Sequence, residues 1–289
     1  MERTDPLTGD RVRVVAERQG RPNLPATDCP FCPGGLEAPE AYEVHAFANR
    51  WPPLPVGHAE IVLYTPRHDA SFADLSPAEA RRVVDLWADR SAALGARPEV
   101  AYVLVFENRG HEVGATITHP HGQIYAFEQV PPRPEHELTS GDAAAALGPA
   151  APGTRLIAAG SDGWRAWVPW APSWPYEVVL APDRPVPDLP TLDGAGRDGL
   201  GSLLADVVGR LDRLFATDAD SPVPMPYMLW FHQRPFDGEP WPTAWLHAHL
   251  APLLRSAGTP RFVAAGELGG GVWFNPVDPE DAARRLREA

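Results

Sequence analysis

The sequence has very little cysteine, with only Cys29 and Cys32 among 289 residues. This scarcity excludes a small secreted scaffold held together by disulfides, and in a cytosolic chain the C-x-x-C spacing favours half of a zinc site or a redox pair. The sequence also lacks an apolar run long enough to span a bilayer, and residues 1–5 lack the apolar core of a signal peptide. We therefore expect a cytoplasmic protein with no membrane partner.

Positive charge is the second scarce property. The chain carries 25 Lys and Arg residues against 38 Asp and Glu residues, which gives a formal net charge of −13. A nucleic-acid-binding protein needs a basic face for the phosphate backbone, so this balance argues against nucleic acid as a partner. It also predicts that an anionic substrate must be met by a local cluster of arginines, because the overall field repels it.

Two stretches predict long helices. Ser76 is followed by Pro77 and Glu79, the pattern of an N-cap with a capping box, and apolar residues continue on one face to about residue 94. Apolar residues recur with helical spacing from about residue 197 to 215, and a short third helix is expected from Pro279 to the C-terminus. The 35 prolines predict many loops between short strands.

Several segments rich in β-branched and aromatic residues predict strands: 60–64, 102–106, 123–127, 164–169, 177–180, 227–231 and 246–250. The order of elements repeats, since each half has a strand ending in proline, a helix, a strand and a final H-x-H strand. We therefore predict an α+β fold made of a tandem pair of similar units, 1–150 and 151–289, with mostly antiparallel sheets and flanking helices. An Ala/Gly/Pro-rich linker at 143–153 is expected to be mobile. A single merged domain is the alternative.

The segment from Gly114 to Gln123 reads G-A-T-I-T-H-P-H-G-Q and carries the strongest chemical pattern. Alternate residues of a strand share a face, so we expect His119, His121 and Gln123 to point the same way. An imidazole is a competent nucleophile toward phosphorus at neutral pH, and a neighbouring amide can donate a hydrogen bond to a phosphoryl oxygen. The full string favours covalent catalysis over a strand whose histidines only satisfy hydrogen bonds.

This string resembles the active-site motif of the galactose-1-phosphate uridylyltransferase family, a branch of the histidine-triad superfamily. Further markers follow in the family's order: D-P-L-T-G-D at 5–10, C-P-F-C-P-G at 29–34, F-E-N-R-G at 106–110, W-P-Y-E at 174–177, P-F-D-G-E at 235–239 and L-H-A-H at 246–249. The resemblance covers nearly the whole chain. It implies two histidine-triad-like units, the first of them catalytic, and a homodimer whose active sites are shared between subunits.

The resemblance also implies roles for individual residues. His121, the second histidine of H-P-H, is expected to take uridylyl from UDP-glucose and pass it to a hexose 1-phosphate in a ping-pong reaction, while Gln123 holds the phosphoryl oxygens. Structural zinc, for which two thiolates and two imidazoles suit tetrahedral geometry, is expected at Cys29, Cys32, His68 and His119. A second metal, iron or zinc, is expected at Glu137, His232, His247 and His249, with His232 on a loop.

Substrate binding is implied for a larger set. Arg18 and Arg21 are expected to reach the substrate phosphates from the partner subunit, since arginine can grip phosphate with two hydrogen bonds. The nucleotide pocket is expected to be formed by Phe47, Asn49, Ile61, Asn108, Gly114 and Thr116. The hexose-binding segment is expected to include Arg261, Phe262 and Glu267.

Two departures from the family pattern leave other substrates open. Arg50 stands where the best-known members carry Asp near the ribose. The hexose segment begins with Arg261 in place of Lys, and the expected Gln is not evident within residues 268–273. One alternative is therefore a related nucleotidyltransferase or dinucleotide phosphorylase with a different nucleotide or acceptor. The other is a metal-binding scaffold without activity, against which the intact H-P-H-G-Q string argues.

Overall fold

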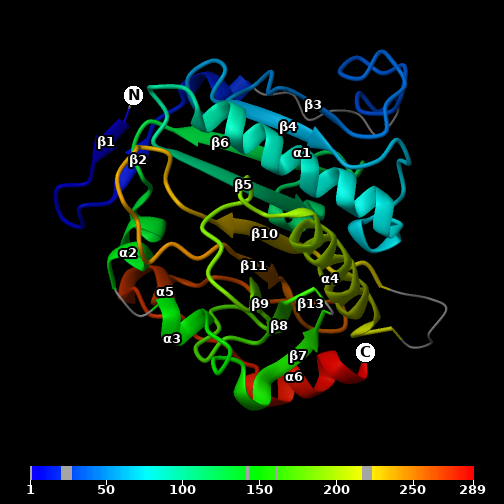
Figure 1. Ribbon diagram of the computed structural model, residues 1–289. Helices are drawn as coiled ribbons and strands as arrows, with labels where there is room; N and C mark the ends of the chain where they lie inside the picture. Colours follow the sequence, from blue (N-terminus) through cyan, green and yellow to red (C-terminus); the bar gives the residue numbers. More distant parts are fainter. Residues whose placement is uncertain (1, 21–27, 141–142, 161, 217–222) are drawn as a thin grey trace.

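A nine-stranded sheet runs through the whole molecule (Figure 1). The computed structural model describes residues 2–20, 28–140, 143–160, 162–216 and 223–289. In spatial order the strands are β3 (His45–Ala48), β4 (Ala59–Leu63), β6 (His121–Phe127), β5 (Tyr102–Arg109), β10 (Tyr227–His232), β11 (His247–Pro252), β9 (Val178–Pro182), β8 (Trp164–Trp167) and β7 (Leu156–Ala159). Each neighbouring pair in this sheet is antiparallel, which confirms the predicted fold class.

The two halves of the sequence meet in the middle of this sheet, where β5 pairs with β10. The two H-x-H segments occupy equivalent registers on either side. His121 on β6 lies opposite Leu63, and His249 on β11 lies opposite Val179. Leu63 and Val179 each precede a proline by three residues. The repeat read from the sequence is therefore also a repeat in strand pairing.

Two long helices, α1 (Pro77–Gly95) and α4 (Gly194–Arg213), pack together over one face of the sheet (Figure 1). Each helix begins at a residue whose side chain caps its first turn, and for α1 this cap is the predicted Ser76. The Ser76 side chain accepts a hydrogen bond from the Glu79 amide, and the Asp193 side chain accepts one from the Gly196 amide. These caps satisfy amides that would otherwise lack partners in the first turn.

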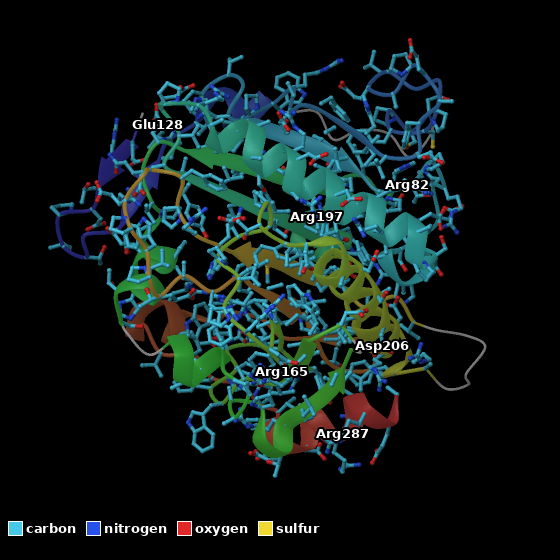
Figure 2. All side chains as sticks on the ribbon, in the orientation of Figure 1. Arg82, Glu128, Arg165, Arg197, Asp206 and Arg287 are labelled. Atoms are coloured by element: carbon cyan, nitrogen blue, oxygen red, sulfur yellow. The ribbon has the colours of Figure 1, made fainter. Side chains whose placement is uncertain are left out.

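The core lies between these helices and the sheet. Alternate residues of the central strands turn toward the helices and are almost fully buried: Val62, Val103, Val105 and Ile124. They share one apolar cluster with Val83 of α1 and with Leu204 and Val208 of α4. At the rim of this layer Arg197, labelled in Figure 2, donates to Asp85 of α1 over 2.9 Å and ties α4 to α1. Because the helices cover one face only, side chains with the opposite phase project from the other face, where the histidines lie.

The remaining elements are short. They are β1 (Glu2–Thr4), β2 (Arg11–Arg13), β12 (Leu254–Ser256), β13 (Thr259–Pro260), the 3-10 turns η1 (Ala16–Gly20), η2 (Phe72–Asp74), η3 (His111–Val113) and η4 (Gly153–Arg155), and the helices α2 (Pro132–Ser140), α3 (Ala143–Leu147), α5 (Ala265–Gly270) and α6 (Pro279–Glu288). Within the described residues no helix combines the length and the hydrophobicity needed to cross a lipid bilayer.

The predicted helices and all seven predicted strands are present, with ends shifted by a few residues. Two placements are corrected. His119 lies ahead of its strand, because the intervening Pro120 has no amide proton for the ladder and β6 begins only at His121. His232 is the last residue of β10 and not part of a loop. The segment expected to be a linker, 143–153, contains the helix α3 and ends at the first residue of η4.

Candidate active site and metal centres

His121 opens the strand β6 and lies at the wall of a cavity of about 350 Å³. Along β6 the buried residues alternate with half-buried ones, so His121 and Gln123 project from the face that α1 and α4 leave uncovered. Asn108 at the end of β5 and Thr116 line the same cavity. The structure thus brings three of the predicted substrate and catalytic residues, Asn108, Thr116 and His121, to one hollow.

The His121 ring is oriented by one backbone bond. Its Nδ1 lies 2.8 Å from the His119 carbonyl oxygen. A carbonyl only accepts, so Nδ1 carries the proton and Nε2 is the unprotonated nitrogen of the neutral ring. Phe31 meets the ring edge-on, with a centroid separation of 5.1 Å. This is the geometry required of an imidazole nucleophile.

Gln123 belongs to a row of side chains that crosses three strands. It lies opposite Ile61 on β4, and Ile61 lies opposite Phe47 on β3. Residues opposed in a ladder project to the same side of the sheet, so these three share the face of His121. Asn49 follows β3 directly, and its side chain accepts a hydrogen bond from the Trp51 amide over 2.9 Å. Among the described residues these four do not line the His121 cavity itself.

Gly114 shapes the loop that leads into the motif. It caps the turn η3 with a left-handed backbone, φ 86°, which glycine adopts without strain. It does not line the cavity, whereas Ala115 and Thr116 directly after it do. Its structural contribution is therefore to turn the chain toward the cavity.

Cys29, Cys32, His68 and His119 form a compact group whose ligand atoms all lie within 4.8 Å of one another. Cys32 Sγ is 3.4 Å from His68 Nδ1 and 3.6 Å from His119 Nδ1. Burial and the neighbouring Cys29 raise the pKa of the Cys32 thiol, and burial lowers the pKa of His119. The lowered pKa keeps the His119 imidazole neutral, which is the form that binds a cation, whereas Cys32 must lose its proton to bind one.

The orientation of His119 fits a metal ligand. Its Nε2 lies 2.8 Å from the Thr65 carbonyl oxygen and 2.9 Å from the Tyr42 hydroxyl, which itself donates to the Phe31 carbonyl. Nε2 is therefore the protonated nitrogen, and Nδ1 faces Cys32. A backbone acceptor of this kind on the far nitrogen is typical of metal-bound histidine.

Glu137, His232, His247 and His249 form a second group within the same 4.8 Å limit, although they come from α2, β10 and β11. The Glu137 carboxylate lies 2.6 Å from His232 Nδ1 and 3.4 Å from His247 Nε2. Burial opposes ionisation of Glu137, yet the hydrogen bonds from these two histidines lower its pKa below the usual range. Burial lowers the pKa of His232 to about 4.

Outer contacts orient this second group as well. His247 Nδ1 lies 2.8 Å from the Trp245 carbonyl oxygen, and His249 Nδ1 lies 3.2 Å from Glu177. In both rings Nδ1 is therefore the donor, which leaves Nε2 as the nitrogen that can bind a metal. Three imidazoles and one carboxylate suit a first-row transition metal. The structure therefore contains two groups that could hold a metal ion.

The two predicted arginines lie elsewhere. Arg18, on η1, lines a separate surface hollow of about 750 Å³ with Arg3, Arg13 and Arg50. Arg21 lies outside the described residues. Arg50 makes an ion pair with Glu37 over 2.8 Å. The hollow therefore gathers four arginines on a chain whose net charge is −13.

The predicted hexose-binding residues sit near α5. Arg261 and Glu267 form a buried ion pair, and Glu267 also accepts from the amides of Ala264 and Phe274. The Arg261 guanidinium lies 4.4 Å from the ring centroid of Trp174. Phe262 beside it is 76% exposed, an unusual position for a large apolar side chain. None of these residues lines the His121 cavity within the described part of the chain.

Sequence reasoning missed several residues that shape the site. Tyr42 and Glu177 orient metal-group histidines, and Glu107 and Arg109 line the His121 cavity. Glu107 did leave a signal in the sequence. It directly follows the predicted strand 102–106, and the alternation of that strand places this charged residue on the buried face. The other contacts join residues far apart in sequence.

Two family profiles match the chain. "Galactose-1-phosphate uridyl transferase, N-terminal domain" matches residues 50–131, and the C-terminal domain of the same name matches residues 153–289. A galactose-1-phosphate uridylyltransferase of Streptomyces lividans is 40% identical over 99% of this chain and 86% of its own length. One from Thermotoga maritima is 34% identical over 99% of this chain and 97% of its own length. The chain belongs to the galactose-1-phosphate uridyl transferase family.

Solved structures agree with this membership. A structure described as a uridylyltransferase superposes with a TM-score of 0.87 at 28% identity, covering 100% of this chain and 98% of the other. An ADP-glucose phosphorylase from Arabidopsis thaliana has the same fold, with a TM-score of 0.78 at 23% identity over 100% and 99% of the two chains. The galactose-1-phosphate uridyl transferase family is thus matched by sequence and by fold, and its members named here are nucleotidyltransferases.

Proposed function

We propose that this chain is a UDP-glucose–hexose-1-phosphate uridylyltransferase that works by a ping-pong mechanism through a uridylyl-His121 intermediate. The observation that carries the proposal is the orientation of His121. Its protonated Nδ1 is held by the His119 carbonyl, and its unprotonated Nε2 belongs to a ring at the wall of the cavity. Close relatives named galactose-1-phosphate uridylyltransferase support the choice of substrates.

In the proposed first step His121 Nε2 attacks the α-phosphorus of UDP-glucose, and the phosphorus–oxygen bond to glucose 1-phosphate breaks. Glucose 1-phosphate leaves as an anion that needs little acid assistance. The ring becomes cationic, and its Nδ1–H bond to the His119 carbonyl gains the strength of a charge-assisted bond. In the second step a phosphate oxygen of hexose 1-phosphate attacks the same phosphorus, and Nε2 leaves. Gln123 donates to the phosphoryl oxygens in both steps.

The experiment for this proposal is mass spectrometry of the intact protein after incubation with UDP-glucose alone. We expect a stoichiometric, acid-labile UMP adduct that is absent in His121→Gly. His111→Gly is the matched control, because His111 lines the same cavity but is 89% exposed. No adduct in the parent protein, or an undiminished adduct in His121→Gly, contradicts the proposal.

A second candidate is a related nucleotidyltransferase or dinucleotide phosphorylase with another nucleotide or acceptor. Arg50 favours it, since a cation paired with Glu37 stands beside Asn49 where the best-known members of the family carry a carboxylate. The same adduct assay with UDP-, ADP-, GDP- and dTDP-glucose separates the two candidates. A faster or more complete adduct from a donor other than UDP-glucose supports the second one.

For the metal groups we propose zinc at Cys29, Cys32, His68 and His119, and iron or zinc at Glu137, His232, His247 and His249. Thiolates and imidazoles with oriented outer contacts fit these ions. Zinc bound at the first group would fix the start of β6, where the His119 carbonyl meets the His121 ring. Metal analysis by mass spectrometry tests both, with Cys32→Ser and His249→Ala each expected to lose one ion per chain.

We further propose a cytoplasmic homodimer of two-unit chains, 1–150 and 151–289, in which Arg18 and Arg21 serve the partner's active site. The separation of Arg18 from the His121 cavity supports this arrangement. Mixing inactive Arg18→Ala and His121→Gly proteins tests it after subunit exchange. Recovered activity is expected if the two residues act from different subunits, whereas a mixture that stays inactive despite exchange contradicts sharing.

A further inference from the structure

A buried polar chain lies directly behind the strand that carries His121. Within the described residues, three of its atoms have no hydrogen-bond partner at bonding distance: the Trp87 indole nitrogen, the Tyr64 hydroxyl and Glu107 Oε2. Burial and the neighbouring Glu107 raise the pKa of Tyr64 well above its usual value, while the Trp87 N–H opposes the shift. The three groups therefore adjoin one another. Glu107 Oε1 accepts from the Tyr227 hydroxyl over 2.9 Å.

The Tyr64 hydroxyl rests on the backbone of Gly122. A Cβ at position 122 would lie 2.2 Å from this hydroxyl and 3.1 Å from the Phe106 carbonyl oxygen. Gly122 follows His121 directly in β6 and faces the helices, whereas His121 faces the cavity. A movement of the Tyr64 hydroxyl therefore displaces the peptide next to His121, because a close-packed interior has no free volume to accommodate it.

The orientation of the Tyr64 hydroxyl depends on the charge of Glu107. The Trp87 nitrogen can only donate, so the Tyr64 oxygen faces this N–H and the Tyr64 proton is directed toward Glu107. An ionised Glu107 accepts a hydrogen bond from Tyr227 and attracts the Tyr64 proton electrostatically. When Glu107 Oε2 carries a proton, this attraction is lost. Burial raises the pKa of Glu107 to about 7, so both charge states occur near neutral pH.

The groups facing Glu107 come from four elements. Tyr64 follows β4, Tyr227 lies on β10, and Arg109 lies on β5 two residues from Glu107. From α4, Asp212 binds Arg109 over 2.7 Å. Arg109 lowers the pKa of Glu107 and Asp212 raises it, so the two partly cancel. The charge of Glu107 itself is then the variable part of this network near pH 7.

We infer that Glu107 is a positioning residue for nucleotidyl transfer: ionised, it holds the Tyr64 hydroxyl over Gly122 and so fixes the His121 ring at the cavity, and protonation releases this hold. The inference rests on the proposed function of His121. Glu107 lines the edge of the His121 cavity, but its carboxylate is directed to Tyr227 and Tyr64 on the helix-covered side of the sheet, so it acts through Tyr64 and not on the reacting atoms.

The test is the pH dependence of the first half-reaction, measured by rapid quench as UMP-adduct formation from UDP-glucose. Glu107→Gln keeps the shape but cannot ionise, so it mimics the protonated state. We expect its rate to fall about tenfold at about pH 8.5, while at about pH 5.5 it differs from the parent by about twofold at most. Apparent affinity for UDP-glucose should change little. Glu288→Gln, at an exposed carboxylate of α6 outside the cavity, should keep the parent's profile.

Coupling with Tyr64 separates positioning from general damage. In a Tyr64→Phe background Glu107→Gln should add no further loss, because the hydroxyl that transmits the effect is gone. Equal losses at both pH values, or losses that multiply in the double variant, overturn the inference.

A readout that needs no substrate keeps this test apart from the proposed function. In the substrate-free protein the ring resonances of His121, followed by NMR against pH, should show a second inflection near pH 7 that disappears in Glu107→Gln. If the parent forms no adduct, the proposed function fails while this titration still decides the role of Glu107. An unchanged titration in Glu107→Gln refutes the role.

Discussion

Replacing Gly122 by alanine puts a methyl group 2.2 Å from the Tyr64 hydroxyl, more than 1 Å inside the ordinary contact distance of about 3.4 Å. Tyr64 cannot step aside easily. It is 1% exposed, and its ring meets Phe72 and Trp87 edge-on with centroid separations of 5.7 and 5.6 Å. Gly122→Ala therefore overpacks a rigid part of the core.

The expected cost follows from this geometry. Overpacking a well-filled core costs about 1–3 kcal/mol, and the rigid surroundings of Tyr64 place this case near 3 kcal/mol of unfolding free energy. In Tyr64→Phe the hydroxyl is gone, and the ring carbon at 3.0 Å becomes the nearest side-chain atom to the added methyl group. A shift of a few tenths of an ångström then suffices, so alanine should cost about 1 kcal/mol. The coupling energy between the two sites is thus about 2 kcal/mol.

Urea unfolding of the four proteins of this cycle, followed by tryptophan fluorescence, measures the coupling. Gly266→Ala is the control, since a Cβ there meets no atom within 4 Å, and it should change the unfolding free energy by about 1 kcal/mol or less. If the costs of Gly122→Ala and Tyr64→Phe add within about 0.5 kcal/mol, the close approach described here is refuted.

Three further predictions concern charge and metal. The pKa of Glu107 is about 7 in the folded chain against a usual 4.5, so the folded state keeps this proton to a higher pH than the unfolded state does. The unfolding free energy should therefore fall by about 3 kcal/mol as the pH rises from 4.5 to 7. Urea titrations at several pH values should show that this contribution to the fall is absent in Glu107→Gln. Asp212→Asn breaks the half-buried pair with Arg109 and should cost about 3 kcal/mol, whereas Asp206→Asn, in a more solvent-accessible helical pair, should cost about 0.5 kcal/mol or less in the same assay. Cys32→Ser should remove one metal ion per chain by elemental analysis and lower the melting temperature, because bound metal stabilises only the folded state.

Local pattern predicted the elements well where the signal was contained within one element. The capping box at Ser76 and the helical spacing after it located α1, and β-branched runs located the central strands. The four-residue strand β3 was not predicted, because His45–Ala48 is too short for alternation to be recognised. His119 was misplaced on the strand because the effect of Pro120 on the ladder was not weighed.

The candidate site could be predicted only in part from the sequence, because some of its contacts join residues that are far apart along the chain. The two groups of metal-ligand residues were predicted through the family resemblance, and the structure brings each group together. Glu107 could not be assigned a role, because Tyr227, which donates to it, is 120 residues away in the sequence. Contacts of that span are fixed by strand pairing, which no local pattern encodes.

The junction between β5 and β10 also has a consequence for how the chain is made. Arg109 of β5 pairs with Tyr227 of β10, and more than a hundred residues separate the two in the sequence, so β5 is synthesised long before this neighbouring strand. Until residues 227–232 leave the ribosome, β5 is an open edge strand with unpaired backbone groups, next to the nascent His121 cavity. During synthesis the first half of the protein therefore exposes an edge strand that can pair with other chains. Truncated chains that end before β10 should aggregate and not accumulate as soluble half-proteins.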